Sequence, residues 1–170
     1  MAAGSVATTQ KAILDAIVAR LRDQVSVFNS TTLTLVASAE QAEQSSKRNG
    51  IWGAVLPMQG AYDDAEFTGG GHHSLVEHTG ATVILFSNRR TDQAGSSEDW
   101  MTDSVEGLLE LKRLVLKALA TWVPVNDSSE RIVINALQPV HSDPPQKGNG
   151  EKVGDLALTF STDFEWDLTT

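Results

Sequence analysis

Cysteine is absent from the 170 residues of the chain. This absence excludes disulfide bridges, thiolate nucleophiles and cysteine-based metal sites. Long apolar runs are missing as well, so no segment is predicted to be a transmembrane helix. The first residues, MAAGSVATTQK, lack a basic stretch followed by an apolar block. They therefore indicate a flexible lead-in over residues 1–8 rather than a signal peptide.

Basic residues are few. Lysine and arginine number 13 against 22 aspartates and glutamates, which gives a formal net charge of −9. Phosphate repels so acidic a chain, and we expect no specific binding of nucleic acid. Hydrophobic residues make up 41% and charged residues 21%, as is typical of soluble globular proteins. The length favours a single domain over residues 1–170.

Recognisable catalytic motifs are missing too. The sequence contains neither G-x-S-x-G nor a phosphate-binding P-loop. The best metal candidate is HHSLVEH, with His72, His73, Glu77 and His78, but its spacing matches neither H-E-x-x-H nor H-x-x-E-H. We interpret these residues as exposed loop histidines. The prediction is therefore a protein without catalytic residues, cofactor or metal; a metal-dependent enzyme that uses the cluster from His72 to His78 is the alternative.

Hydrophobic periodicity predicts two main helices and four strands. The helices are expected from Thr8 or Thr9 to about residue 25, and over residues 99–122. The strands are expected over residues 51–57, 81–87, 131–140 and 156–168, with a long inter-strand loop at 140–153. Residues 30–50 are ambiguous between a short strand or loop and a short helix. Consecutive strands joined by loops favour an α+β fold, with a mostly antiparallel sheet packed by two helices on one face and with long loops or a hairpin arm.

The closing strand, LALTFSTDFEWDL, has two unlike faces. Its even positions are large and apolar except for Thr162, and its odd positions are small or polar. At about 3.3 Å per residue the strand spans roughly 43 Å, longer than a small domain needs. We therefore predict that a neighbouring copy of the chain completes it. The predicted subunit interface consists of Phe160, Phe164, Trp166 and Leu168.

The opposite face of this strand is acidic. In a ring, Asp163, Glu165 and Asp167 would repeat around the circle and line a negatively charged channel if they faced inward. Duplex DNA would slide through such a channel without specific binding. The alternative is the solvated face of an edge strand, on which charges discourage aggregation.

The layout as a whole resembles the tail terminator proteins of long-tailed phages, the small lambda-type ring-formers. The matching segments are QKAILDAIVARL, IWGAVLP, ATVILFS, DSVEGLLELKRLVLKAL, RIVINALQPV and the ending FEWDL, and they extend from about residue 10 to residue 168. The resemblance implies an α+β subunit and a ring, usually of six copies, that caps the tail tube and stops its polymerisation. It also implies partners in the tube protein and the head-side connector, a location in the neck of the virion after synthesis in the host cytoplasm, and no contact with a membrane.

Other interpretations remain open at this point. Another neck or head–tail connector protein, or a tail-tube subunit, has a similar small α+β fold and ring symmetry. A tube subunit should polymerise by itself, whereas a terminator should stop at a ring. A cellular ligand-binding domain would be a monomer in solution.

Overall fold

The computed structural model describes residues 6–44, 50–62, 66–68, 72–87, 99–105, 107–147 and 153–167. Its two long helices are α1 (Val6–Gln24) and α4 (Leu108–Leu119), and its two short ones are α2 (Ala39–Gln44) and α3 (Asp99–Thr102). The strands are β1 (Leu33–Leu35), β2 (Ile51–Pro57), β3 (Ala61–Tyr62), β4 (Glu66–Thr68), β5 (His72–Ser87), β6 (Gln138–Ser142) and β7 (Gly154–Asp167). None of the described helices combines the length and apolar character of a membrane-spanning helix.

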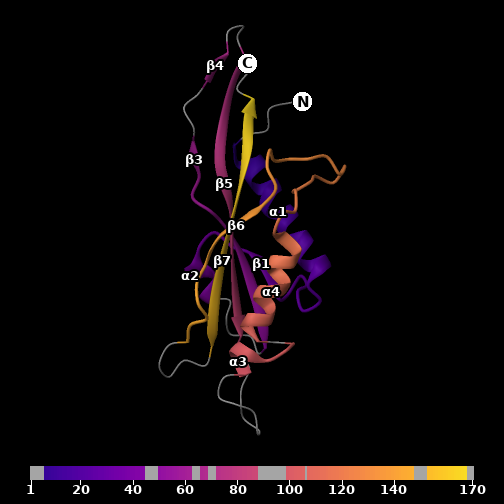
Figure 1. Ribbon diagram of the computed structural model, residues 1–170, viewed down its shortest axis with the longest axis vertical. Helices are drawn as coiled ribbons and strands as arrows, with labels where there is room; N and C mark the ends of the chain where they lie inside the picture. The colour runs from indigo at the N-terminus through magenta and orange to yellow at the C-terminus, as the bar shows by residue number, and fades with distance from the viewer. Residues whose placement is uncertain are drawn as a thin grey trace.

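The strands form one sheet in the order β1-β2-β5-β7-β6, and β3 and β4 also pair with β5. All described pairings are antiparallel except that of β1 with β2. The sheet is built around β5 and β7, which run along the long axis of the molecule (Figure 1). The fold is therefore α+β and mostly antiparallel, as the sequence predicts.

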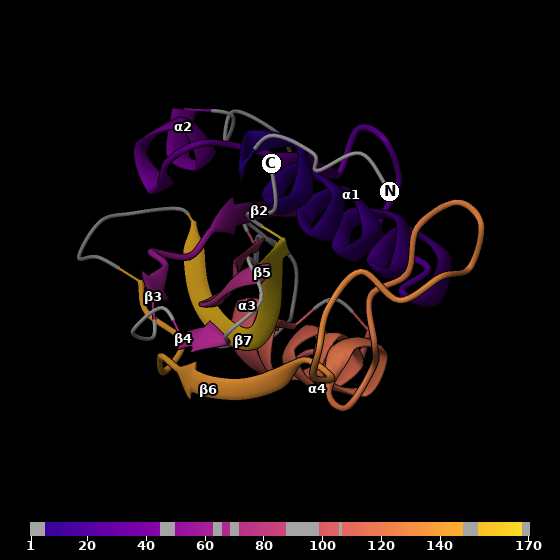
Figure 2. The ribbon, with the colours of Figure 1, turned by 90° about the horizontal axis from the view of Figure 1, so that it is seen from above.

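The main core lies between one face of this sheet and the two long helices. Ile13, Ile17 and Leu21 recur at every fourth position of α1, so they share one side of the helix, and all three are buried. Leu111 and Val115 of α4 belong to the same cluster. Figure 2 shows α1 and α4 on the same side of the sheet. The prediction of two helices on one face is confirmed.

The opposite face of the sheet has a smaller core beneath α2. Trp52 of β2 stacks on Phe86 of β5, with ring centroids 5.3 Å apart, and Ala42 of α2 packs against the same cluster. Successive β2 residues therefore enter different cores, and residues 51–56 are all buried. This double burial explains why IWGAVLP is almost continuously apolar.

Several predicted boundaries are wrong. The first helix begins at Val6, within the predicted lead-in, while residues 1–5 lie outside the described part of the chain. The predicted helix over 99–122 is two helices, and α4 begins after Gly107, which provides no side-chain cap. The inter-strand loop begins at residue 143 rather than 140, because β6 extends to Ser142.

The predicted strand at 131–140 is mostly irregular. Its backbone bonds go to three different segments, because Ile132 N donates to Pro124 O, Ile134 N to Asp163 O and Leu137 N to Trp122 O. Only Gln138–Ser142 forms a strand. The apolar residues in this stretch therefore fill gaps between elements instead of following one neighbouring strand.

Candidate assembly arm

Above Gly80 the sheet continues as an arm, whose lower part still contacts α1. We define the arm as β3, β4, residues 72–80 of β5 and residues 161–167 of β7. At about 3.4 Å per residue, the 16 residues of β5 reach roughly 54 Å, about three times the length of an ordinary strand. β7 pairs with β5 without interruption from Gly154 to Asp167. Figure 1 shows the two strands rising together towards β4.

The arm joins the rest of the sheet at Gly80. A Cβ at this position would overlap the backbone carbonyl of Phe160 in β7. Glycine is therefore required by the close approach of the two strands. Met58 N also donates to Gly80 O over 3.2 Å, which ties the end of β2 to the same point.

The inner face of the arm is polar where it meets α1. Glu77 is 1% exposed, and its Oε1 accepts a hydrogen bond of 3.1 Å from Gln10 Nε2. The same amide lies 3.5 Å from Thr79 Oγ1, and Thr79 is also buried. A buried carboxylate is tolerated only when hydrogen bonds replace its water. Gln10 thus connects the beginning of α1 to the arm.

The neighbouring loop and strand complete this polar cluster. A Cβ at Gly60 would overlap Glu77 Oε1, so glycine leaves room for the carboxylate. In β7, Thr162 is 3% exposed and its hydroxyl donates to Asn135 O over 2.5 Å. Thr162 therefore interrupts the apolar face of β7 because it satisfies a backbone carbonyl inside the fold.

The structure contradicts the predicted exposure of two interface residues. Phe160 is 0% exposed and Phe164 is 3% exposed within a single subunit, and both belong to the main core. Their prediction as subunit-interface residues is wrong, because α1 and α4 already cover the apolar face of β7. Trp166 lies opposite Leu75 in the β-ladder, but its side chain is outside the described part, as is all of Leu168.

The acidic face of β7 is only partly solvated. Asp163 Oδ1 pairs with Nδ1 of His78, which lies directly opposite on β5. Asp163 Oδ2 accepts a hydrogen bond of 2.6 Å from Asn135 Nδ2. Asp163 therefore has protein partners for both oxygens while its side chain stays 27% exposed, so the solvated face expected as the alternative holds only in part.

The other two acidic residues of this face differ from Asp163. Glu165 is exposed, whereas the side chain of Asp167 is outside the described part. That Asp163, Glu165 and Asp167 line a channel stays a prediction.

The histidine cluster is part of a strand and not of a loop. His72 and His73 pair with β4, and His78 pairs with Ala61 of β3. Sequence reasoning missed this half of β5 because polar residues and three preceding glycines obscured its strand pattern. Among the described residues, no group of three or more His, Asp or Glu side chains is arranged to hold a metal ion.

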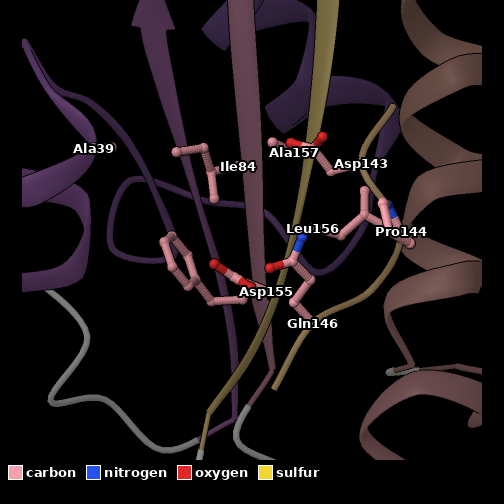
Figure 3. Close-up of a pocket in the computed structure, with 9 residues that line it drawn as sticks. Ala39, Ile84, Asp143, Pro144, Gln146, Asp155, Leu156 and Ala157 are labelled. Carbon is pink, nitrogen blue, oxygen red and sulfur yellow. The ribbon is translucent and has the colours of Figure 1, made fainter. Parts of the chain in front are cut away.

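A small cavity lies on the α2 side of the sheet. Its volume is about 130 Å³, less than half of a small ligand pocket. Figure 3 shows Ile84 of β5 on one side, Asp143 and Gln146 on the other, and Asp155 between them. Asp143 Oδ1 already bonds His141 Nε2 over 2.8 Å. The cavity has the size for a few waters or one side chain, and it brings no nucleophile and base together.

The sequence matches no protein-family model, and no curated protein is significantly similar to it. The functional proposal therefore depends on the architecture of the subunit and on the resemblance in layout described above.

Proposed function

We propose that this chain is the tail terminator of a long-tailed phage, a structural virion protein whose ring caps the tail tube and joins it to the head-side connector. The arm is the observation that carries this proposal. The strand pair continues past the buried Phe164 to the exposed Glu165, and such an extension is typical of a subunit that contacts its neighbours. The ring, the number of copies and the partners are all part of the proposal.

The acidic net charge of the chain is compatible with a role as a tail terminator. The net charge of −9 keeps DNA from adhering to the protein, and Glu165 adds an exposed carboxylate near the tip of the arm. DNA would pass through the ring without being bound specifically. The buried Phe160 and Phe164 give the proposal no support, because they stabilise the subunit itself.

Electron microscopy and mass photometry of the purified chain test the proposal. We expect closed rings of uniform size, and we expect the protein to stop elongation when it is added to polymerising tube protein from the same phage. Long polymers of the chain alone would instead indicate a tail-tube subunit. A protein that stays monomeric at high concentration would contradict the proposal, and bound zinc, manganese or iron would favour the metal-enzyme alternative.

A further inference from the structure

The sheet has several edges, and two of those in the described part, β1 and β6, are interrupted at individual residues. At β1, Leu33 N donates to Asn29 O over 3.1 Å and Leu33 O accepts from Arg22 Nη2 over 2.7 Å, so both groups are occupied. At β6, Pro139 has no N–H to donate, and the pairing with β7 is irregular between Pro139 and His141. Interruptions of this kind discourage uncontrolled pairing with other chains.

The end of β7 is different. The odd-numbered residues of β7 direct their backbone groups away from β5: Ala157 O accepts from Asp143 N, and Asp163 O accepts from Ile134 N. Glu165 is the next residue in this series. In the part of the chain that the structure describes, no strand pairs with the outer side of Glu165, and no backbone hydrogen bond reaches its outward N–H or C=O. Its outward N–H and C=O are therefore open to another chain.

The surface next to this open edge is suited to a partner. Ile134 is 40% exposed, and its N–H is bonded to Asp163, directly before the open positions. Its carbonyl accepts from Arg131 Nη2 over 2.6 Å, which fixes the segment in place. A strand added at Glu165 would continue in line with Ile134 and cover part of its side chain.

The opposite edge of the arm is formed by β4. β4 pairs with β5 through Glu66, Phe67 and Thr68, and Ser74 of β5 pairs with both Glu66 and Asp167. The tip is thus a three-stranded ribbon with β7 on one side and β4 on the other. Two unlike edges of one ribbon are what a head-to-tail interface requires, and such an interface closes into a ring when the rotation between subunits permits.

We propose that the open edge of β7 at Glu165 pairs with β4 of a second copy of this chain. This inference rests on the proposed ring, and it names the segments that join neighbouring subunits. Glu66 and Glu165 place acidic residues on both edges, so charge repulsion opposes the contact. Association is therefore expected to strengthen as salt rises and screens these charges.

A proline substitution tests the open edge directly. The N–H of Glu165 points away from β5, so Glu165→Pro removes no bond of the β5–β7 ladder. We expect Glu165→Pro to keep the circular dichroism spectrum and melting temperature of the parent while it weakens association about tenfold or more. Glu165→Ala retains the N–H and should associate at least as well as the parent. Equal association of the proline and alanine variants in a folded protein would overturn the inference.

Cysteine cross-linking identifies the partner strand, because the chain has no cysteine of its own. Glu165→Cys is combined in turn with cysteine at Glu66, Phe67 or Thr68. Within one subunit β4 and β7 are about 9.6 Å apart, two strand spacings, which is too far for a disulfide. We expect at least one pair to give a covalent ladder under oxidation, whereas Glu165→Cys with Val140→Cys should not.

The outcomes separate this inference from the proposed function. Rings without any β4–β7 cross-link would overturn the pairing and leave the terminator proposal standing. Cross-linked open chains without rings would support the pairing and contradict the terminator. A monomeric protein that forms no cross-link would contradict both.

Discussion

β5 passes through two environments, and its two halves differ in what covers them. Residues 81–87 are packed on both faces, with Val83 and Leu85 beneath the long helices and Phe86 against Trp52. Residues 72–80 have β3 and β4 on one side, β7 on the other, and a buried carboxylate at Glu77. We call the part of the molecule outside the arm the body. The difference shows that apolar burial stabilises the body, whereas in the arm a buried polar cluster accompanies the apolar packing of Phe164.

The largest expected effect is a loss of stability in the body. Phe160→Ala removes a side chain that is 0% exposed, and it leaves a cavity between β7 and the helices. We expect the free energy of unfolding to fall by about 3–5 kcal/mol, as urea denaturation would measure it. The exposed Val140→Ala should change it by less than about 0.5 kcal/mol. A folded Phe160→Ala variant of nearly unchanged stability that fails only in association would restore the interface role predicted from sequence.

A smaller effect, confined to the arm, is expected from Gln10→Ala. This change removes the amide that donates to Glu77 Oε1, so a buried carboxylate loses a hydrogen bond. We expect this loss to lower the stability of the arm by about 1–3 kcal/mol. Hydrogen exchange should be faster at residues 72–80 than in the parent, with little change at residues 81–87.

Gln24→Ala is the matched control for Gln10→Ala. Gln24 lies at the other end of α1, is exposed, and bonds only the neighbouring Asp23 among the described contacts. Its removal should leave exchange in the arm unchanged. If Gln10→Ala instead accelerated exchange equally in both halves of β5, the arm and the body would be one cooperative unit, and the distinction between them would fail.

The sequence predicts the body better than the arm for a physical reason. Residues 51–57 match β2 at both ends, because burial on both faces demands an unbroken apolar run. The apolar run of residues 81–87 predicts the second half of β5 for the same reason, but the polar stretch before it does not predict the continuation of β5 to His72. In the arm, neighbouring strands and the Gln10 amide bond the polar groups of residues 72–80. These partners are distant in sequence, so the contacts leave no local pattern from which the strand could be predicted.

Contacts between distant segments also explain why the closing strand is misinterpreted from sequence, where Phe160 and Phe164 are predicted to contact a neighbouring subunit. Its alternation correctly predicts a buried even-numbered face, and Leu156, Leu158 and Phe160 are all buried. A periodic pattern shows that a face is covered, but it does not show what covers it. Here α1 and α4 of the same chain cover Phe160 and Phe164, which is why the proposed contact uses the edge at Glu165 and not these two aromatic side chains.

A smaller effect than that of Gln10→Ala is expected from Asp163→Ala in the arm. The substitution removes the partner of His78 and of Asn135 Nδ2. Because the site is partly exposed, we expect the free energy of unfolding to fall by about 1 kcal/mol. Thermal unfolding at neutral pH would measure it. A loss as large as that of Phe160→Ala would mean that the arm depends on this contact as strongly as the body depends on its core.

Glu110→Gln on α4 removes a charge pair of the body, and its effect can be compared with that of Asp163→Ala in the arm. Hydrogen bonds from Arg113, 2.8 and 2.6 Å long, lower the pKa of Glu110 below its ordinary value. A carboxyl with a lowered pKa stabilises the fold above its ordinary pKa, and this contribution disappears as the pH falls through the lowered pKa. The parent should therefore be slightly more stable than Glu110→Gln at pH 7 and equal to it in strong acid. Arg113 is exposed and Glu110 is partly exposed, so solvent screening keeps even the neutral-pH difference small. A difference that persists in strong acid would show that Glu110 acts through packing rather than through its charge.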